Sequence, residues 1–569
     1  MRNNIKRCVC IVLTLVLLAL TLSGCGSKEK RINFVYPFTA DVNSYDPQIA
    51  STSDEFLIIE NTFEGLIRID DEGNIIKGCA DSWEISDDGL TYTFNLKQGL
   101  KWNITTDKYE EGDNKGEFKD KRLQMLGYEF NPDITAHDFV FALRRAVLPE
   151  TEAPMFPSVS SITNAVEINS GKLGADKLGV TAKDDYTLVI TLTSPDSSFM
   201  QTLSSSVAMP CNEEFFNATK GRYGLDTKYT LFNGQFYVNQ ILESSYLLKR
   251  NEEYKGEFPT VISQLSLKIV DENGTDSAGK TVYDKLESGS YDAAFITGQQ
   301  SDKIGKTNGI TLTPYEDTTW ALLLNTADEI FSNTTLRHAF CIGLSRIAES
   351  DRDYLSDAKN LTPPSCLIGT EIAAEKIGVT AYTENNSKSI ELWLKGIKEL
   401  ESRDIEITVL TTPEMETPLK ELLQGVQSGI ATVVKDSDGN AVTFTLKVET
   451  LEMAELDTAI AKREYDAVLY PFKSASPSPI TFLRSFTDEN KTGFDSTAAE
   501  TALSSAEAAK DNESTAEYVR QAEQAIVDSF SIYPVLSQKS YYACAKNVCG
   551  INFHAGSGRV SFVNATREE

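Results

Sequence analysis

The second half of the chain predicts a mixed α/β fold built around a layered sheet. A helix-period stripe over residues 389–400 is followed by short apolar runs at 405–410, 442–451 and 465–470, with helical patterns between them. Strands that alternate with helices in this way belong to sheets covered by helices. Hydrophobic residues make up 41% of the 569 residues and charged residues 24%, as in globular proteins with a large core. This length allows about three or four domains.

The first third of the chain contains both kinds of element. Residues 53–66 carry large apolar side chains at helical spacing, whereas 91–97 alternate apolar and polar residues as a half-buried strand does. A second helix is predicted over 135–147, with Thr135 as N-cap and Asp138 at the capping-box position. Further predictions are strands at 187–192 and 264–270, an inserted surface loop at 105–133, and a helical stretch at 497–530 broken at 510–514.

The first 25 residues have the layout of a bacterial export signal. A basic start precedes an apolar run over residues 8–22, which ends in the small-residue sequence LSGC. The run is too short for a helix that must cross roughly 30 Å of hydrocarbon. LSGC resembles the bacterial lipobox, so residues 1–24 are predicted to be a lipoprotein signal peptide and Cys25 the lipid attachment site. A plain signal peptide followed by an ordinary cysteine is the alternative.

A phosphate-loop pattern occurs once in a suggestive setting. GTDSAGKT, residues 274–281, matches G-x-x-x-x-G-K-[ST], after a strand-like run and before a helix-like one. An exported protein meets no maintained pool of nucleoside triphosphate, and Asp276 would place a carboxylate among the phosphates. We therefore expect a surface turn between a strand and a helix, and no cofactor.

Charge and residue usage exclude several classes of function. A formal net charge of −29 repels nucleic acid phosphates, so no nucleic acid partner is expected. The three histidines are scattered, and neither H-E-x-x-H, G-x-S-x-G nor C-x-x-C occurs, so neither a catalytic nor a metal site is predicted. The protein is therefore not expected to be an enzyme.

Six cysteines follow the leader and the predicted anchor, and the sequence does not choose among their pairings. One pair, five residues apart, suggests a small disulfide-closed loop, while free buried thiols are the alternative. The six are Cys79, Cys211, Cys341, Cys366, Cys544 and Cys549, of which the last two form that pair.

Segments along the whole chain after the leader resemble one family. The resembling blocks include SYDPQIA (44–50), the long block 61–102, TAHDFVFALRRAVLP (135–149), and blocks within 233–256, 285–295, 322–346, 465–486 and 531–536. Their content and order are similar to those of the extracytoplasmic oligopeptide-binding proteins of lipoprotein type. These are the family 5 solute-binding proteins that serve peptide ABC transporters.

The resemblance implies a periplasmic-binding-protein-like type II fold of the α/β class, with two lobes, an extra third domain and a hinged ligand cleft. By position in the family, domain I gathers residues 25–63, 192–317 and 539–569. Domain II holds residues 64–191 and domain III residues 318–538.

The resemblance also implies where a ligand would lie. In relatives that hold peptides, the ligand is extended between the lobes and pairs its backbone with protein strands. Transferred by position, the ligand-binding residues are Ser53, Asp54 and Glu55 in one segment and Tyr470, Phe472 and Lys473 in another, with Trp320 as a further aromatic wall. For the three aromatic residues, plain core packing is the alternative.

The second of these segments departs from the family pattern. Relatives have glycine and tryptophan there, followed by an aspartate that pairs with the ligand's ammonium, whereas this chain has Pro471, Phe472 and Ala475. Proline has no N–H to donate to a strand ladder, and Lys473 adds a positive charge. Either the ligand is of another kind, such as a non-peptide, acidic or N-terminally blocked molecule, or an acid from another segment takes over this role.

The function implied is that of a monomeric receptor, lipid-anchored on the extracytoplasmic face of the bacterial cell membrane. It would bind a small solute, an oligopeptide, and present it to the membrane permease of an ABC importer. A ligand-sensing lipoprotein of the same fold is the alternative, since the sequence does not separate delivery from sensing.

Overall fold

The computed structural model describes residues 32–568 with short gaps. The gaps are residues 71–72, 109, 111, 113–114, 127–129, 197, 272–273, 297, 299–300, 302–308, 348–351, 353, 370, 401–402, 434, 436–437, 475–476, 488–494, 510 and 555–558. The predicted leader and the predicted lipid site Cys25 lie outside the described residues. Within the described ranges no helix combines the length and the apolar character needed to cross a membrane.

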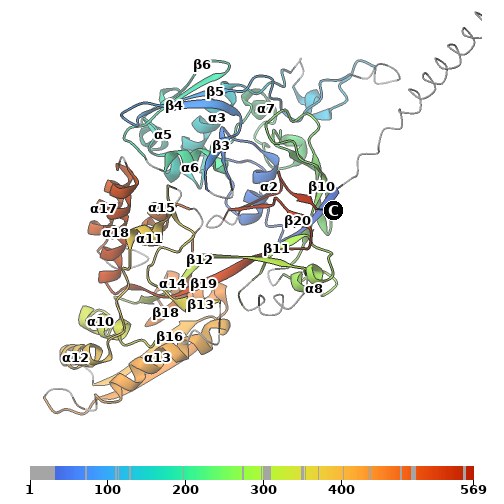
Figure 1. Ribbon diagram of the computed structural model, residues 1–569. Helices are drawn as coiled ribbons and strands as arrows, with labels where there is room; N and C mark the ends of the chain where they lie inside the picture. Colours follow the sequence, from blue (N-terminus) through green and yellow to red (C-terminus); the bar gives the residue numbers. More distant parts are fainter. Residues whose placement is uncertain are drawn as a thin grey trace, which may run out of the picture.

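A mixed sheet forms the centre of the second half of the chain, as the alternating pattern predicts (Figure 1). Its strands are β11 (Ala293–Ile296), β12 (Thr311–Leu324), β13 (Leu355–Asp357), β16 (Asp404–Thr411), β17 (Thr443–Thr450), β18 (Ala467–Lys473) and β19 (Ile532–Cys544). They are ordered β11-β19-β12-β18-β16-β17, with β13 beside β19. The β16 pairings with β17 and β18 are parallel, and those of β12 with β18 and β19 are antiparallel.

Helices cover both faces of this sheet. The helices are α10 (Thr334–Ile342), α12 (Asn386–Gly396), α13 (Glu416–Ile430), α14 (Met453–Lys462), α15 (Pro479–Arg484), α17 (Thr497–Glu507) and α18 (Asn512–Asp528). One core forms where α10, α12 and α13 pack on one face, and Trp393 is completely buried there. A second core forms on the other face beneath α14, α15, α17 and α18, because strand side chains alternate between the two faces.

This sheet and its helices form the second lobe, and the first half of the chain forms the first lobe, which contains two smaller sheets. One sheet has the order β1-β10-β9-β8 and consists of β1 (Ile32–Phe38), β8 (Phe236–Leu242), β9 (Ser245–Arg250) and β10 (Ile262–Ile269). The other has the order β4-β5-β7-β6 and consists of β4 (Ala80–Ile85), β5 (Thr91–Leu96), β6 (Val180–Asp184) and β7 (Thr187–Thr191). The helices of this lobe include α2 (Ser53–Thr62), α3 (Ala136–Val147), α4 (Phe156–Val159), α5 (Ala165–Asn169), α6 (Phe199–Leu203), α7 (Glu213–Ala218) and α8 (Val282–Glu287). Small two-stranded ribbons complete the described strands: β2 (Ile67–Ile69) with β3 (Ile75–Lys77), β14 (Leu367–Ile368) with β15 (Glu371–Ile372), β20 (Val548–Cys549) with β23 (Thr566–Arg567), and β21 (Asn552–His554) with β22 (Arg559–Ser561).

One continuous hydrophobic core runs through this lobe. It joins Phe34 of β1, Phe139 of α3 and Phe562 near the C-terminus. The segments assigned to domains I and II therefore pack as one body. The finer division into three domains stays a prediction.

Two long strands link the lobes. β12 and β19 pair over most of their length, from Thr311 opposite Cys544 to Leu323 opposite Ile532. The pairing register shifts between Tyr315 and Thr318, so the ribbon is irregular there. Tyr315 packs on Phe553 of one lobe, whereas Trp320 belongs to the core of the other, so the shift lies where the ribbon passes between the lobes.

Local capping chemistry explains two helix boundaries. The Thr135 amide donates to the Asp138 carboxylate over 2.8 Å at the start of α3, as the capping box predicts. The predicted break in the helical stretch is confirmed, but it comes slightly earlier than 510–514, because α17 ends at Glu507 and α18 begins at Asn512. Asp511 caps α18 by accepting a hydrogen bond from the Ser514 amide over 2.8 Å, so residues 512–514 are already helical.

The phosphate-loop pattern forms a turn that is satisfied from within. The Asp276 carboxylate accepts hydrogen bonds from the amides of Ala278 (2.9 Å) and Lys280 (2.8 Å), and its other oxygen lies 2.8 Å from the Lys285 ammonium. The loop thus directs its amides at its own carboxylate rather than at a phosphate. The structure agrees with the expected turn between β10 and α8.

None of the six cysteines named above, all of which are described, forms a disulfide in the structure. Cys79, Cys211, Cys341 and Cys366 are buried, and Cys544 and Cys549 are partly exposed. All six side chains are therefore unbridged thiols, so the structure shows the alternative without disulfides.

Candidate ligand cleft

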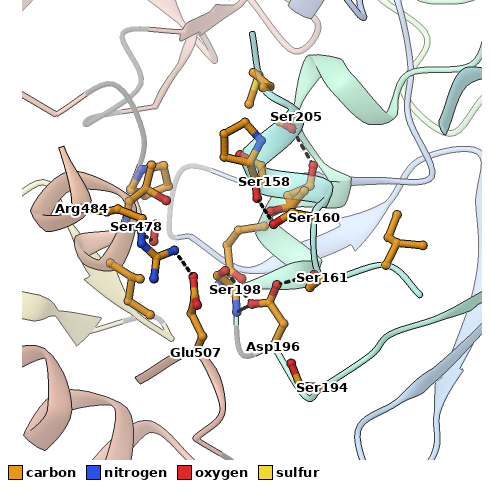
Figure 2. Close-up of a pocket in the computed structure, with 18 of the residues that line it drawn as sticks. Ser158, Ser160, Ser161, Ser194, Asp196, Ser198, Ser205, Ser478, Arg484 and Glu507 are labelled. Atoms are coloured by element: carbon orange, nitrogen blue, oxygen red, sulfur yellow. Dashed lines mark hydrogen bonds and ion pairs between the residues drawn. The ribbon is translucent and has the colours of Figure 1, made fainter. Parts of the chain in front are cut away.

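A cleft of about 750 Å³ lies between the two lobes. One wall comes from the first lobe, from the segments around α4 and α6, and the other from the second lobe, from α15 and the end of α17 (Figure 2). Phe56 of α2 and Ile69 of β2 also line it. Its volume falls in the range of sites that hold small organic ligands.

Hydroxyl groups dominate the polar lining of the cleft. They belong to Ser158, Ser160, Ser161, Thr193, Ser194, Ser198, Thr202, Ser205, Ser206, Ser478, Thr481 and Ser485. Apolar surface from Met155, Ile162, Val166 and Ile480 lies between them. Serine and threonine both donate and accept hydrogen bonds, so such walls can meet either end of an amide.

Asp196 is a half-buried carboxylate on the first-lobe wall. Its Oδ2 accepts a hydrogen bond from the Ser161 hydroxyl over 2.9 Å. Its Oδ1 accepts from the Ser198 amide over 2.9 Å and from the Ser198 hydroxyl over 2.8 Å. Burial raises the pKa of Asp196, and the charge of Glu507 adds to this, while the serine bonds work in the opposite direction.

Arg484 and Glu507 face Asp196 from the second lobe (Figure 2). The Arg484 Nη1 is ion-paired with Glu507, and its Nε lies 3.9 Å from Glu500. Burial opposes the charge on Arg484, but the bond to Glu507 and the neighbouring carboxylates outweigh it and raise the pKa of this guanidinium. The arginine is thus paired with acids of its own lobe.

The first predicted ligand segment lies at the start of α2. The Asp54 carboxylate accepts hydrogen bonds from the Thr39 hydroxyl (2.5 Å) and the Asp41 amide (3.0 Å). The Glu55 carboxylate accepts from the amides of Asn43, Ser44, Ser51 and Thr52 at 2.7–3.1 Å. Both acids therefore hold the preceding loop in shape. Ser53 begins the helix, and Phe56, the first residue after this segment, reaches the cleft.

The aromatic residues of the other predicted set pack against protein. Trp320 is 1% exposed, and its Nε1 donates to Gln538 over 2.5 Å. The Tyr470 hydroxyl donates to Asp457 over 2.8 Å. The Phe472 ring lies 5.1 Å from the Tyr470 ring and 4.7 Å from that of Phe486, centroid to centroid. These contacts fit the core-packing alternative, most strongly for Trp320.

Lys473 lies at the end of β18, where its ammonium is 3.3 Å from the carboxylate of Asp317. Asp317 is 1% exposed, and its Oδ1 accepts a hydrogen bond from the Thr318 hydroxyl over 2.8 Å. Pro477 and Ser478, shortly after β18, line the cleft. Both predicted segments thus border the cleft without lining it, and their contact with a ligand stays a prediction.

Sequence reasoning missed the polar residues that do line the cleft. Asp196, Arg484 and Glu507 come from three separate segments, and each stands among many other charged residues. No local pattern distinguishes them. They meet only because the two lobes face one another.

The family model of the bacterial extracellular solute-binding proteins, family 5 (middle), matches residues 74–494. The chain belongs to this family. Its members bind solutes outside the cytoplasm and are not enzymes, and both statements hold for this protein.

Two curated relatives cover almost the whole of this solute-binding protein. A dipeptide-binding protein of Lactococcus lactis is 24% identical over 95% of this chain and 96% of its own length. The oligopeptide-binding protein OppA of Bacillus subtilis is 23% identical over 98% of this chain and 97% of its own.

Solved structures establish the fold. The substrate-binding domain of an oligopeptide ABC transporter from Bacillus anthracis superposes with a TM-score of 0.68 at 21% identity, covering 95% of this chain and 99% of its own. Listeria monocytogenes OppA bound to peptide gives 0.68 at 20% identity, with 95% and 100% covered. The murein tripeptide-binding protein of Escherichia coli gives 0.69 at 17% identity, with 95% and 99% covered. The predicted type II periplasmic-binding fold of the α/β class is confirmed.

Proposed function

We propose that this protein is the peptide receptor of an ABC importer. It takes up an oligopeptide in the cleft between its lobes and delivers it to a membrane permease. The observation that carries the proposal is the cleft of about 750 Å³ whose two walls belong to different lobes. The printed names of the two curated relatives, a dipeptide-binding and an oligopeptide-binding protein, support the choice of ligand.

Closure follows from this geometry. A solute that contacts both the α6 wall and the α15 wall is bound more tightly when the lobes approach, so binding shifts the equilibrium from open to closed. The irregular stretch of the β12–β19 ribbon, near Tyr315 and Thr318, lies between the lobes, and the ribbon would bend there as the lobes close. The closed form is then what the permease recognises.

The hydroxyl-lined walls suit a peptide of variable sequence. Each peptide unit has one donor and one acceptor, and serine or threonine can satisfy either. Ser53, Tyr470, Phe472 and Lys473 remain proposed contacts at the margin of this cleft, whereas Asp54, Glu55 and Trp320, whose polar groups are bound within the protein, would support the site from behind. They would add specificity for chain length or for the ends of the peptide.

The anchoring part of the proposal rests on the first 25 residues. Removal of residues 1–24 and lipidation of Cys25 would hold the protein, as a monomer, on the outer face of the cell membrane. A single acyl chain gives only reversible binding, so the anchor would carry more than one. Mass spectrometry of the mature N-terminus tests this: an unmodified Cys25, or a retained leader, would contradict it.

The test of function is binding by the purified protein. Solutes that co-purify are identified by mass spectrometry, and calorimetry then measures the affinity of short synthetic peptides. Recovery of peptides, with micromolar or tighter binding, is expected. Recovery of a different class of solute together with failure to bind any peptide would overturn the proposal. Transport of a labelled peptide that disappears when a neighbouring permease gene is deleted would separate delivery from ligand sensing.

A further inference from the structure

The charges that line the cleft are unbalanced. Among the described residues that line the cleft, they comprise three carboxylates, Glu167, Asp196 and Glu507, and one guanidinium, that of Arg484. Glu507 and Glu500 already pair with Arg484 from the same lobe. Glu167 is exposed. Among the described residues, Asp196 is the partly buried carboxylate of the cleft that forms no ion pair, although it feels the charge of Arg484 at longer range.

All the hydrogen-bond donors found for Asp196 are neutral. They are the Ser161 hydroxyl and the amide and hydroxyl of Ser198. In the part of the chain that the structure describes, no lysine, arginine or histidine nitrogen is recorded within 4 Å of this carboxylate. A carboxylate that loses water without gaining a cation costs free energy. Arg484, which is already paired with Glu507 and Glu500, compensates the charge of Asp196 only in part, so a cation bound beside Asp196 would be stabilised.

A second group in the cleft lacks a donor. Gln201 lies on α6, five residues after Asp196, and lines the same cleft. Its Oε1 is buried and has no hydrogen-bond donor among the described residues. An unsatisfied buried carbonyl oxygen costs about 1–3 kcal/mol, which a ligand donor would recover. The first-lobe wall thus offers two hydrogen-bond acceptors, the Asp196 carboxylate and Gln201 Oε1. A ligand group with several N–H donors would satisfy both.

We propose that the cleft selects solutes that carry a cationic nitrogen, and that Asp196 is the residue which accepts it. This inference rests on the proposed function and names the class of peptide: one with an ammonium or guanidinium group placed against Asp196. Ser161 and Ser198 hold the carboxylate in position, and Gln201 Oε1 can accept a further hydrogen bond from the same cation. Closure of the α15 wall over the site removes water and strengthens the pairing.

The cation has two sources in a peptide, its N-terminus and a basic side chain. Three C-terminally amidated tripeptides separate them. Acetyl-Ala-Lys-Ala offers only a side-chain ammonium, H-Ala-norleucine-Ala offers only the terminal one, and acetyl-Ala-norleucine-Ala offers neither. Calorimetry on the purified full protein gives the affinity of each.

At least one cationic peptide should bind about tenfold more tightly than the neutral peptide, the size expected of a charge-assisted hydrogen bond. Asp196→Asn should reduce this preference to within about twofold, because asparagine keeps an acceptor for Ser198 but has no charge. Asp184→Asn makes the same charge change at an exposed position of the same lobe, on β6, and should keep the preference. A thermal melt of each variant confirms folding.

The outcomes separate the two proposals. If all three peptides bind with equal affinity, the charge inference fails and the peptide receptor stands. If none binds and no peptide co-purifies, the proposed function fails. If the cationic preference survives in Asp196→Asn, or if that variant loses affinity equally for all three peptides, Asp196 is not the acceptor of the cation and the inference is overturned.

Discussion

Arg145 and Asp46 form a buried ion pair with two contacts. The Arg145 Nη1 lies 3.1 Å from Asp46 Oδ1, and its Nη2 lies 2.5 Å from Oδ2. Arg145 belongs to α3, and Asp46 to the loop between β1 and α2. Nη1 also donates to Gln48 over 2.8 Å, and the guanidinium stacks 4.2 Å from the Phe216 ring centroid. The pair joins segments assigned to domains I and II and thus holds them together within the first lobe.

Loss of one partner of this pair should be severe. Arg145→Met leaves the Asp46 charge buried without a cation, and such changes lower the free energy of unfolding by about 3–5 kcal/mol. Urea denaturation measures this change. Asp46→Asn combined with Arg145→Met should be less destabilised than the two single losses added together. A loss below about 1 kcal/mol for Arg145→Met would contradict the assigned role.

Glu523 holds the loop before β14 in place from inside the second lobe. This residue is completely buried, and its carboxylate accepts hydrogen bonds from the amides of Leu361 and Thr362, each over 2.9 Å, and from the Thr380 hydroxyl. Glu523→Ala leaves these donors unsatisfied and should lower the free energy of unfolding by about 2–5 kcal/mol. Glu523→Gln keeps one acceptor oxygen and should lose less. Equal stability of Glu523→Ala and the parent in urea would show that water replaces the carboxylate.

The ionisation of Asp196 should make the stability of the protein depend on pH. Burial raises the pKa of Asp196, so the neutral acid suits the fold better than the anion. The stabilisation is fully present below the ordinary pKa of an aspartic acid, about 4, and is lost as the pH rises through the raised pKa. Without ligand, Asp196→Asn should therefore melt at a higher temperature than the parent at pH 7, and at a similar temperature at pH 4. A lower melting temperature at pH 7 would indicate that the anion is already compensated.

Lys473 offers a test of the predicted ligand segment. Lys473→Met removes the cation beside the buried Asp317, but the lysine is 60% exposed, so the loss of stability should be about 1 kcal/mol or less. If Lys473 also contacts the ligand, its loss should weaken peptide binding about tenfold. Adding Asp317→Asn should restore stability but not affinity. Unchanged affinity in Lys473→Met would remove this residue from the site.

Local elements were predictable because their determinants are close together in the chain. Thr135 and Asp138 lie within one helical turn, and their capping bond forms whatever the rest of the protein does. The start of α18 was placed too late because the KDNES motif was interpreted as a break as a whole, although its aspartate is the cap that starts the helix. The fold class followed from the alternation of strands and helices and from the resemblance to family 5.

The sequence by itself determined which elements form, the family and hence the class of function, since these depend on residues near one another in the chain and on blocks that keep their order. Only the tertiary structure decided which side chains line the cleft. Asp196 follows β7 and Arg484 ends α15, and they face one another because two lobes, joined through β12 and β19, meet there. The same packing turned Trp320 into a core residue and committed Asp54 and Glu55 to a loop. The burial of a side chain and its contacts with distant residues depend on how the whole chain folds, so no short segment of the sequence specifies them.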